Sequence, residues 1–165
     1  MDIEAVEGDI TELRVDAVVN AANRRMRGGG GVDGAIHAAA GPELLDECVE
    51  RFPHGLRTGE AGWTSGHLLP ARWVIHVVGP NYAAGENDRN LLVSCYRNAL
   101  GVADEIGAAT VAFPLVSAGI YGWPRDDAIA AAVDTLRSTP TDVRVATIVA
   151  FGTAAYDEVA EYLLA

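Results

Sequence analysis

Short runs of apolar, mostly β-branched residues alternate along the chain with segments of helical periodicity. Nearly continuous runs of this length are typical of strands that are buried on both faces of a sheet. We expect strands at Ile3–Glu7, Ala17–Asn20, Trp73–Val78, Thr110–Phe113 and Val145–Ala150, and a weaker one at Ala61–Thr64. We expect helices at Val32–Ala40, Pro42–Arg51, Asn90–Ile106, Pro124–Leu136 and Tyr156–Leu164. The alternation predicts an α/β layered fold around a largely parallel sheet.

The sequence gives no sign of a second domain. Its 165 residues suit one domain, residues 1–165, that buries roughly 70% of its unfolded surface, and no linker or repeat divides it. No apolar run approaches the roughly 20 residues that span a bilayer, and the acidic Asp2 and Glu4 leave no basic start for a signal peptide. The two cysteines, Cys48 and Cys95, lack metal-ligand spacing and are expected to be buried, reduced thiols. We predict a monomeric, cytoplasmic protein without membrane contacts.

The ionisable side chains are strongly unbalanced. Twelve basic residues, all of them arginine, stand against 23 acidic residues, for a net charge of −11. Such a surface repels nucleic-acid backbones and anionic membranes, so we expect no nucleic-acid partner except as a modified substrate. An anionic ligand must therefore be held by local dipoles rather than by a basic patch.

Two glycine-rich loops follow expected strands and lead into expected helices. Gly28–Gly31 precedes the helix that begins near Val32, and "PLVSAGIYGWPRDD" follows the strand Thr110–Phe113 and contains Pro124, which suits a first helical turn. Ligands of such sheets sit beyond the carboxyl ends of the strands, where glycines admit close approach and helix N-termini offer unpaired N–H groups. One such loop is more often structural, but two at one end of a sheet favour a cradle for a diphosphate.

Five segments, in order, resemble the macrodomain family, and within it the MacroD-type ADP-ribosyl hydrolases of the O-acetyl-ADP-ribose deacetylase branch. The segments are GDIT (Gly8–Thr11), VDAVVNAAN (Val15–Asn23), GGGGVDGAIHAAAG (Gly28–Gly41), LPARWVIHVVGP (Leu69–Pro80) and FPLVSAGIYGWP (Phe113–Pro124). The resemblance covers nearly the whole chain. It implies a three-layer α/β/α sandwich with a mixed sheet, an ADP-ribose cleft across its top, and no metal or organic cofactor.

The resemblance also implies where each part of ADP-ribose binds. Asp9 accepts a hydrogen bond from the adenine amino group, a donor that suits an obligate acceptor, and Ile10 and Phe151 contact the adenine. Asn23 holds the distal ribose beside Tyr121. The diphosphate rests on backbone groups of Gly30, Gly31, Val32, Ser117, Ala118, Gly119 and Ile120. Two alternatives remain open: Asp9 as a cap of the segment that follows it, and Phe151 as a core aromatic.

Catalysis is expected to centre on Asp33, in the first turn of a helix, where the dipole stabilises a carboxylate. A carboxylate stabilised in this way is a weaker base, so its expected task is to orient a water molecule held against a phosphate oxygen. His37 lies four residues later on the same face and is assigned a supporting role, with orientation of the loop alone as the alternative. Asn23 holds the ribose that carries the scissile bond. A helix cap is the alternative for Asp33. The other histidines show no metal-ligand spacing and are interpreted as structural: His54, His67 and His76.

Some residues depart from the family pattern. Ala38 stands where many relatives carry arginine, and Arg24, Arg25 and Arg27 crowd the segment before the glycines. This segment is interpreted as a solvated loop, with contact to an acidic modified protein as the alternative. Asn20 is expected to tie down the loop that follows it.

The leading hypothesis is a hydrolase that removes mono-ADP-ribose from acidic side chains of proteins and deacetylates O-acetyl-ADP-ribose. A non-catalytic reader of ADP-ribose, or a hydrolase of ADP-ribosylated nucleic acid, is the alternative. Asp33 argues against a reader, because macrodomains that lack this aspartate tend to be readers. The sequence leaves open which carbon water attacks, and whether Asp33 or a substrate phosphate takes the proton.

Overall fold

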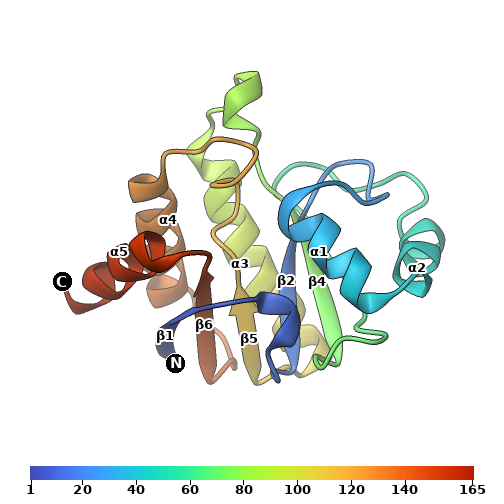
Figure 1. Cartoon of the computed structure of the whole chain (residues 1–165), viewed down its shortest axis with the longest axis horizontal. Helices are drawn as coiled ribbons and strands as arrows, with labels where there is room; N and C mark the ends of the chain where they lie inside the picture. The colour runs from blue at the N-terminus through green and yellow to red at the C-terminus, as the bar shows by residue number, and fades with distance from the viewer.

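A mixed sheet lies between two layers of helices in the computed structural model, which describes residues 1–165 (Figure 1). The strands are β1 (Asp2–Glu7), β2 (Ala17–Ala22), β3 (Ala61–Ser65), β4 (Trp73–Val78), β5 (Thr110–Phe113) and β6 (Val145–Ala150). The helices are α1 (Gly31–Ala40), α2 (Glu43–Arg51), α3 (Arg89–Ile106), α4 (Arg125–Ser138) and α5 (Thr153–Leu164). The strand order is β1-β6-β5-β2-β4-β3, and every neighbouring pair is parallel except β3 and β4. The predicted α/β/α sandwich with a mixed, largely parallel sheet is confirmed.

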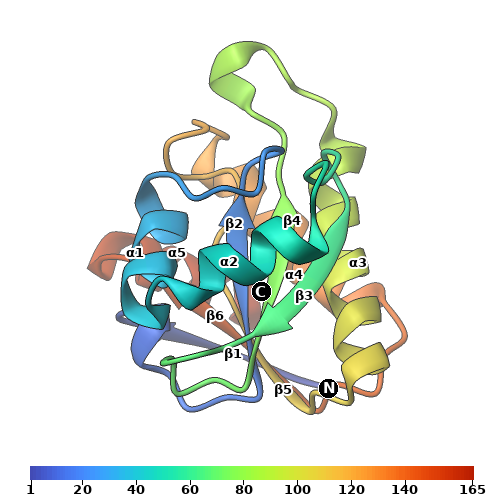
Figure 2. The same ribbon diagram turned by 90° about the vertical axis from the view of Figure 1, so that its right-hand side faces the viewer.

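Each face of the sheet carries its own apolar core. A cluster of 25 buried residues joins one face to α3 and α4, and a cluster of 14 joins the other face to α1 and α2. Figure 2 places α1 and α3 on opposite sides of the strands. Because successive side chains of a strand point to opposite faces, Val19 and Ile75 enter the larger core while Val18 and Val74 enter the smaller one. The same alternation directs Asn20 of β2 toward α1 and α2, where it matters for the site.

The expected elements all form, with small differences at their ends. The strands β4, β5 and β6 begin and end at the predicted residues. β2 runs two residues further than predicted because Ala21 and Ala22 pair with Val77 and Val78 of β4, so Asn23 directly follows the strand. Two 3-10 turns were not predicted, η1 (Ile10–Glu12) and η2 (Tyr82–Ala84). The second belongs to a segment, residues 79–88, that projects beyond the sheet in Figures 1 and 2.

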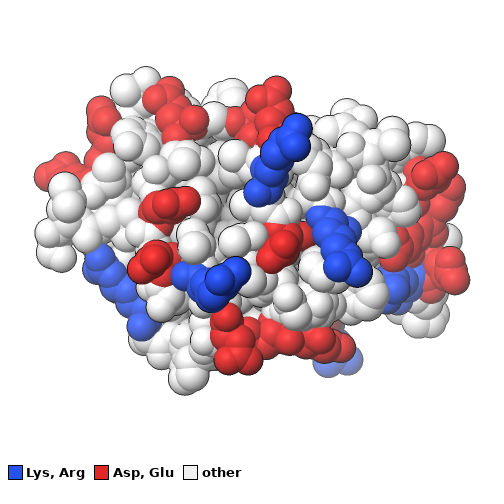
Figure 3. All heavy atoms as spheres, turned by 90° about the horizontal axis from the view of Figure 1, so that it is seen from below, with Lys and Arg blue, Asp and Glu red and all other residues white.

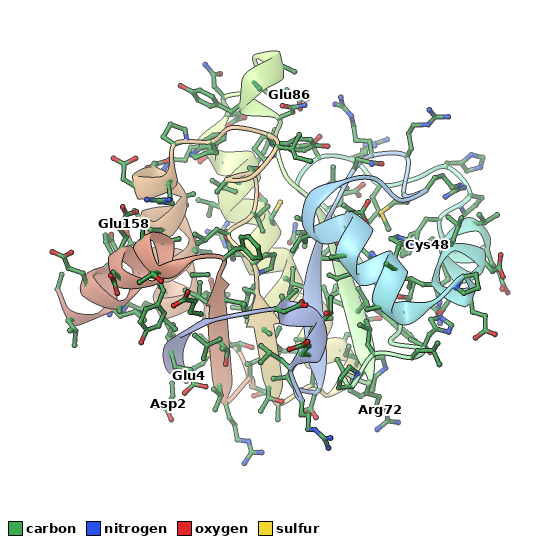
Figure 4. The ribbon with its side chains drawn as sticks, viewed as in Figure 1. Asp2, Glu4, Cys48, Arg72, Glu86 and Glu158 are labelled. Carbon is green, nitrogen blue, oxygen red and sulfur yellow. The ribbon has the colours of Figure 1, made fainter.

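The face at the amino ends of the parallel strands shows arginines interspersed among carboxylates (Figure 3). Asp2 and Arg72 mark this end of the molecule in Figure 4, and Glu86 marks the opposite end. No helix of the structure is long and apolar enough to span a bilayer.

Candidate functional site

A cleft of about 750 Å³ opens at the carboxyl ends of the parallel strands. Its walls are the first loop (residues 23–30, between β2 and α1), the second loop (residues 114–124, between β5 and α4) and the ends of β1 and β6. Every residue that the sequence assigned to ligand contact lines it: Asp9, Ile10, Asn23, Gly30, Gly31, Val32, Asp33, Ser117, Ala118, Gly119, Ile120, Tyr121 and Phe151. The two glycine loops therefore do meet at one site, as their positions after strands predicted.

The first loop delivers the N-terminus of α1 to the cleft without a side-chain cap. Its N-cap is Gly30, and the backbone N–H groups of Gly31, Val32 and Asp33 donate no hydrogen bond within the protein. Gly31 has φ +59°, in the left-handed region that glycine adopts freely. A Cβ atom on Gly30 would lie 3.1 Å from Cδ1 of Ile120, so the two loops touch here. Free donors of this kind at a helix N-terminus form an anion-binding site.

The second loop offers a matching set of donors. The backbone N–H groups of Ser117, Gly119, Ile120 and Tyr121 make no hydrogen bond within the protein, whereas the Trp123 N–H donates to the Ser117 carbonyl (2.9 Å) and fixes the turn. Ser117 itself has φ +65°, a conformation that is strained for a residue with a side chain, and its buried hydroxyl has no protein partner. Strain and unpaired polar groups of this kind concentrate at functional sites.

The one basic side chain on the cleft lining is Arg125, at the start of α4. Its guanidinium donates to both carboxylate oxygens of Glu158 on α5, at 2.7 and 2.8 Å, and Glu158 is labelled in Figure 4. The cleft thus presents backbone dipoles rather than free positive charge, as the net charge of the chain required.

The end of the cleft nearest β1 and β6 combines an acceptor with an exposed aromatic ring. Oδ1 of Asp9 accepts from the backbone N–H (2.9 Å) and the hydroxyl (2.7 Å) of Thr11, so Asp9 caps η1. The capping alternative is therefore correct for this oxygen, and Oδ2 stays free to accept from a ligand. Phe151 is 94% exposed, so its interpretation as a core aromatic is wrong.

Asp33 lies at the other end of the cleft and is only 4% exposed. Its Oδ1 accepts from Nδ2 of Asn20 (2.8 Å), and Nε2 of His37 lies 3.4 Å from the same oxygen. Its Oδ2 is buried without a partner, and a Cβ atom on Gly29 would lie 3.0 Å from this oxygen and 3.1 Å from Nδ2 of Asn23. Asp33 accepts no backbone N–H, so the capping alternative is wrong. His37 contacts Asp33 but does not line the cleft.

Comparison with known proteins decides the family. The Macro domain family model matches residues 19–132. The chain belongs to the macrodomain family. It is 52% identical to a macro domain-containing protein of Streptomyces nogalater over 98% of this chain and 91% of the relative, and 52% identical to one of Methanosarcina mazei over 82% and 72%.

Solved macrodomains share the fold throughout the chain. The Oceanobacillus iheyensis macrodomain with ADP superposes with a TM-score of 0.93 at 42% identity, covering 98% of this chain and 90% of that one. The Trypanosoma brucei macrodomain in complex with ADP-ribose superposes with a TM-score of 0.88 at 39% identity, covering 98% and 68%. Both likenesses extend over the β-sheet and the loops that form the cleft.

The macrodomain also contains a buried polar chain that the sequence did not reveal. Asn20 Nδ2 lies 3.1 Å from Nδ1 of His76, and Nε2 of His76 lies 2.9 Å from Oγ1 of Thr64. All three residues are 0% exposed. Burial, followed by the charge of His37, lowers the pKa of His76 to about 3, so its ring is neutral near pH 7. The sequence signal that could have indicated these contacts is the single polar residue inside each of two apolar runs, Asn20 in VVNAA and His76 in WVIHVV.

The arginine segment of the macrodomain is exposed at Arg24 and Arg25 and partly buried at Arg27. Arg27 donates to the carbonyls of Arg25, Met26 and Phe52, each at 3.1 Å, and so fixes the loop backbone. Arg24 pairs with Glu86 of the projecting segment at 2.9 Å. Arg24 remains exposed, as the solvated interpretation expected, whereas Arg27 is partly buried against the loop carbonyls and does not fit that interpretation.

The projecting segment, residues 79–88, packs against the second loop. The Ala83 N–H donates to the Tyr121 carbonyl (2.9 Å), and the rings of Tyr82 and Trp123 meet edge to face at 5.3 Å. Burial and the nearby Glu86 carboxylate raise the pKa of the Tyr121 hydroxyl. Tyr121 is therefore a neutral phenol at the mouth of the cleft.

The cysteines are buried, as predicted. Burial, followed by the Asp33 carboxylate, raises the pKa of the Cys48 thiol to about 11. Figure 4 shows Cys48 on the α2 side of the molecule, below the first loop. A thiol of such high pKa is a poor nucleophile, so Cys48 fills the core near Asp33 without reacting.

Proposed function

We propose that this macrodomain hydrolyses the ester that joins mono-ADP-ribose to acidic side chains of proteins, and that it also deacetylates O-acetyl-ADP-ribose. The observation that carries the proposal is the buried Asp33 carboxylate, whose unpartnered Oδ2 lies with Asn23 beside Gly29 at the end of a cleft lined by free amides. Structures of other macrodomains with ADP and with ADP-ribose support this choice of ligand. Both substrates carry an acyl ester on the same ribose, so one site serves both.

The proposed pose places the diphosphate between the two sets of unpaired amides. Phosphate oxygens accept hydrogen bonds from these N–H groups. They thereby replace the hydrogen bonds to water that the N–H groups lose when a ligand enters the cleft. The adenine then extends toward Asp9 and Phe151, and the distal ribose toward Asn23. Nδ2 of Asn23 donates to the Gly28 carbonyl (3.0 Å), so its buried, unpaired Oδ1 is the atom that accepts from a ribose hydroxyl.

In the proposed reaction, Oδ2 of Asp33 orients a water molecule. The oxygen of this water bonds to a carbon on one side of the ester oxygen, and the bond between that carbon and the ester oxygen breaks. The water thereby supplies one hydroxyl and one proton, and the products are a carboxylic acid and a ribose hydroxyl. Hydrolysis in ¹⁸O-labelled water distinguishes the two carbons, because the label enters either the released carboxyl group or the ribose.

The test is release of ADP-ribose from a protein modified on glutamate, with the macrodomain at catalytic concentration. Asp33→Ala should lower turnover by at least about 100-fold, the lower end for a positioned acid–base group. Its affinity for ADP-ribose in calorimetry should change only a few-fold, because the backbone amides survive. Asp126→Ala is the matched control, since Asp126 is an exposed aspartate in the first turn of α4 that lies outside the cleft.

Several outcomes would refute the proposal. Undiminished turnover by a folded Asp33→Ala variant, checked by its melting curve, would remove the role of Asp33. Tight ADP-ribose binding by the parent protein with full retention of the label would indicate a reader. Turnover confined to ADP-ribosylated nucleic acid would replace the protein substrate.

A further inference from the structure

The strand register brings three polar side chains together beneath α1. β2 and β4 pair so that Asn20 stands directly opposite His76, and both point toward the smaller core. In the antiparallel pair of β3 and β4, Thr64 stands opposite Val74, which also enters the smaller core, and from there its hydroxyl reaches His76. The chain of contacts therefore runs from the edge strand β3 across β4 and β2 to Asp33 on α1.

Burying these three polar side chains lowers the free energy of unfolding relative to apolar residues, so we look for a function that offsets this loss of stability. Each buried polar group loses hydrogen bonds to water, and well-packed apolar residues of similar size would fill the same space. None of the three side chains lines the cleft, so none is available to touch a ligand. The only member of the network that both lines the cleft and is ionisable is Asp33. Asp33 is therefore the point at which the polar chain reaches the cleft.

The donors and acceptors fix the direction of every hydrogen bond. An ionised carboxylate only accepts, so the atom of the Asn20 amide that faces Asp33 must be Nδ2. The same Nδ2 faces His76 and donates its second hydrogen there, so Nδ1 of His76 accepts. The neutral ring then carries its proton on Nε2 and donates it to Oγ1 of Thr64. The His76 tautomer and the Asn20 amide orientation are thereby coupled.

We propose that Asn20, His76 and Thr64 are positioning residues that hold Asp33 through a relay of fixed polarity. Thr64 selects the Nε2–H tautomer of His76, this tautomer orients the Asn20 amide, and the amide occupies Oδ1 of Asp33. Oδ2 is thereby left facing the space beside Gly29 and Asn23. The inference rests on the proposed function, because it assigns Asp33 the task of orienting water.

The test compares Thr64→Val with Thr64→Ser. Valine matches the shape of threonine but removes the acceptor, so the Nε2–H of His76 loses its partner and the other tautomer becomes competitive. In that tautomer the Nδ1–H of His76 faces an N–H of the Asn20 amide, so two donors oppose each other. The Asn20 amide then rotates, and its hydrogen bond to Oδ1 of Asp33 is lost. We expect kcat to fall about tenfold or more in Thr64→Val, since small misplacements of a reacting group are costly. The affinity of Thr64→Val for ADP-ribose and its KM should stay within about twofold of the parent values. The separate variant Thr64→Ser should keep the kcat of the parent, because serine retains the hydroxyl.

The tautomer itself is read by nuclear magnetic resonance of ¹⁵N-labelled histidine, which needs no turnover. The parent and Thr64→Ser should show the Nε2–H form of His76, and Thr64→Val should show a population of the Nδ1–H form. Equal kcat for the two variants, or an Nδ1–H form in the parent, would overturn the relay. If the parent hydrolyses no ADP-ribosyl ester, the proposed function fails instead, and the tautomer alone decides whether the relay exists.

Discussion

Asp9→Asn separates two tasks that the structure gives to one side chain. Oδ1 of Asp9 caps η1 through Thr11, and in the proposed pose Oδ2 accepts from the adenine amino group. Asparagine is as good a cap as aspartate, so its Oδ1 can keep the bonds to Thr11. Its Nδ2 is then a donor that faces another donor on the adenine. Rotating the amide by half a turn restores the adenine contact but sets Nδ2 against the Thr11 N–H.

The expected loss of affinity follows from this one contact. A lost hydrogen bond to a charged acceptor, with the adenine donor left unpaired, costs about 1–3 kcal/mol, which is roughly 5- to 150-fold in the dissociation constant for ADP-ribose. The melting temperature of Asp9→Asn should stay that of the parent. Asp9→Ala should lose the same affinity and also destabilise the fold by about 1 kcal/mol, because the cap is lost as well.

Calorimetry with ADP-ribose and thermal melts of the three proteins measure both quantities. Unchanged affinity in Asp9→Asn would place the adenine elsewhere in the cleft. A lowered melting temperature in Asp9→Asn would show that the asparagine does not keep the cap, and the affinity loss would then not be assignable to the adenine.

Two further predictions concern the diphosphate and the buried histidine. ADP-ribose should bind at least about 100-fold more tightly than AMP in calorimetry, because AMP leaves the second set of amides and Asn23 unpaired at about 1–3 kcal/mol for each lost contact; equal affinities would remove the diphosphate cradle. The free energy of unfolding should fall as the pH drops from about 6.5 to 3, because the unfolded His76 binds a proton that the folded protein, with its lowered pKa, does not bind. Thermal melts of the parent and of His76→Leu across this range test the sign, since the variant should lack this part of the pH dependence.

The fold and the cleft were predictable where local pattern decides the outcome. Runs such as Trp73–Val78 and Val145–Ala150 are apolar except for one residue each, His76 and Thr147, so their burial on both faces, and hence their strand bounds, followed from composition. The two glycine loops each follow a parallel strand, and parallel strands end at the same edge, so their common edge was predictable. Their direct contact depends on the pairing of β2 with β5, which the sequence did not predict.

The buried polar chain and the contacts of the projecting segment depended on long-range geometry. His76 contacts both Asn20 and Thr64 only because β4 lies between β2 and β3, and no periodicity along the chain encodes that neighbourhood. The pairing of Arg24 with Glu86 likewise joins residues 62 positions apart through a segment without a regular pattern. The sequence therefore did not predict the partners of His76 and Arg24, because those partners are distant in sequence.

The cleft offers amide dipoles to a ligand, and its only arginine is neutralised by Glu158. The association rate of an anionic ligand therefore depends on long-range charge, whereas its dissociation rate depends on short-range contacts. The net charge of −11 repels an anionic nucleoside diphosphate at long range, and salt screens this repulsion beyond roughly 8 Å at physiological ionic strength. The short-range contacts inside the cleft are neutral donors and release few counterions. Added salt should therefore quicken the encounter with such an anion and leave its residence time nearly unaltered, which is the reverse of the behaviour of sites lined with lysine and arginine.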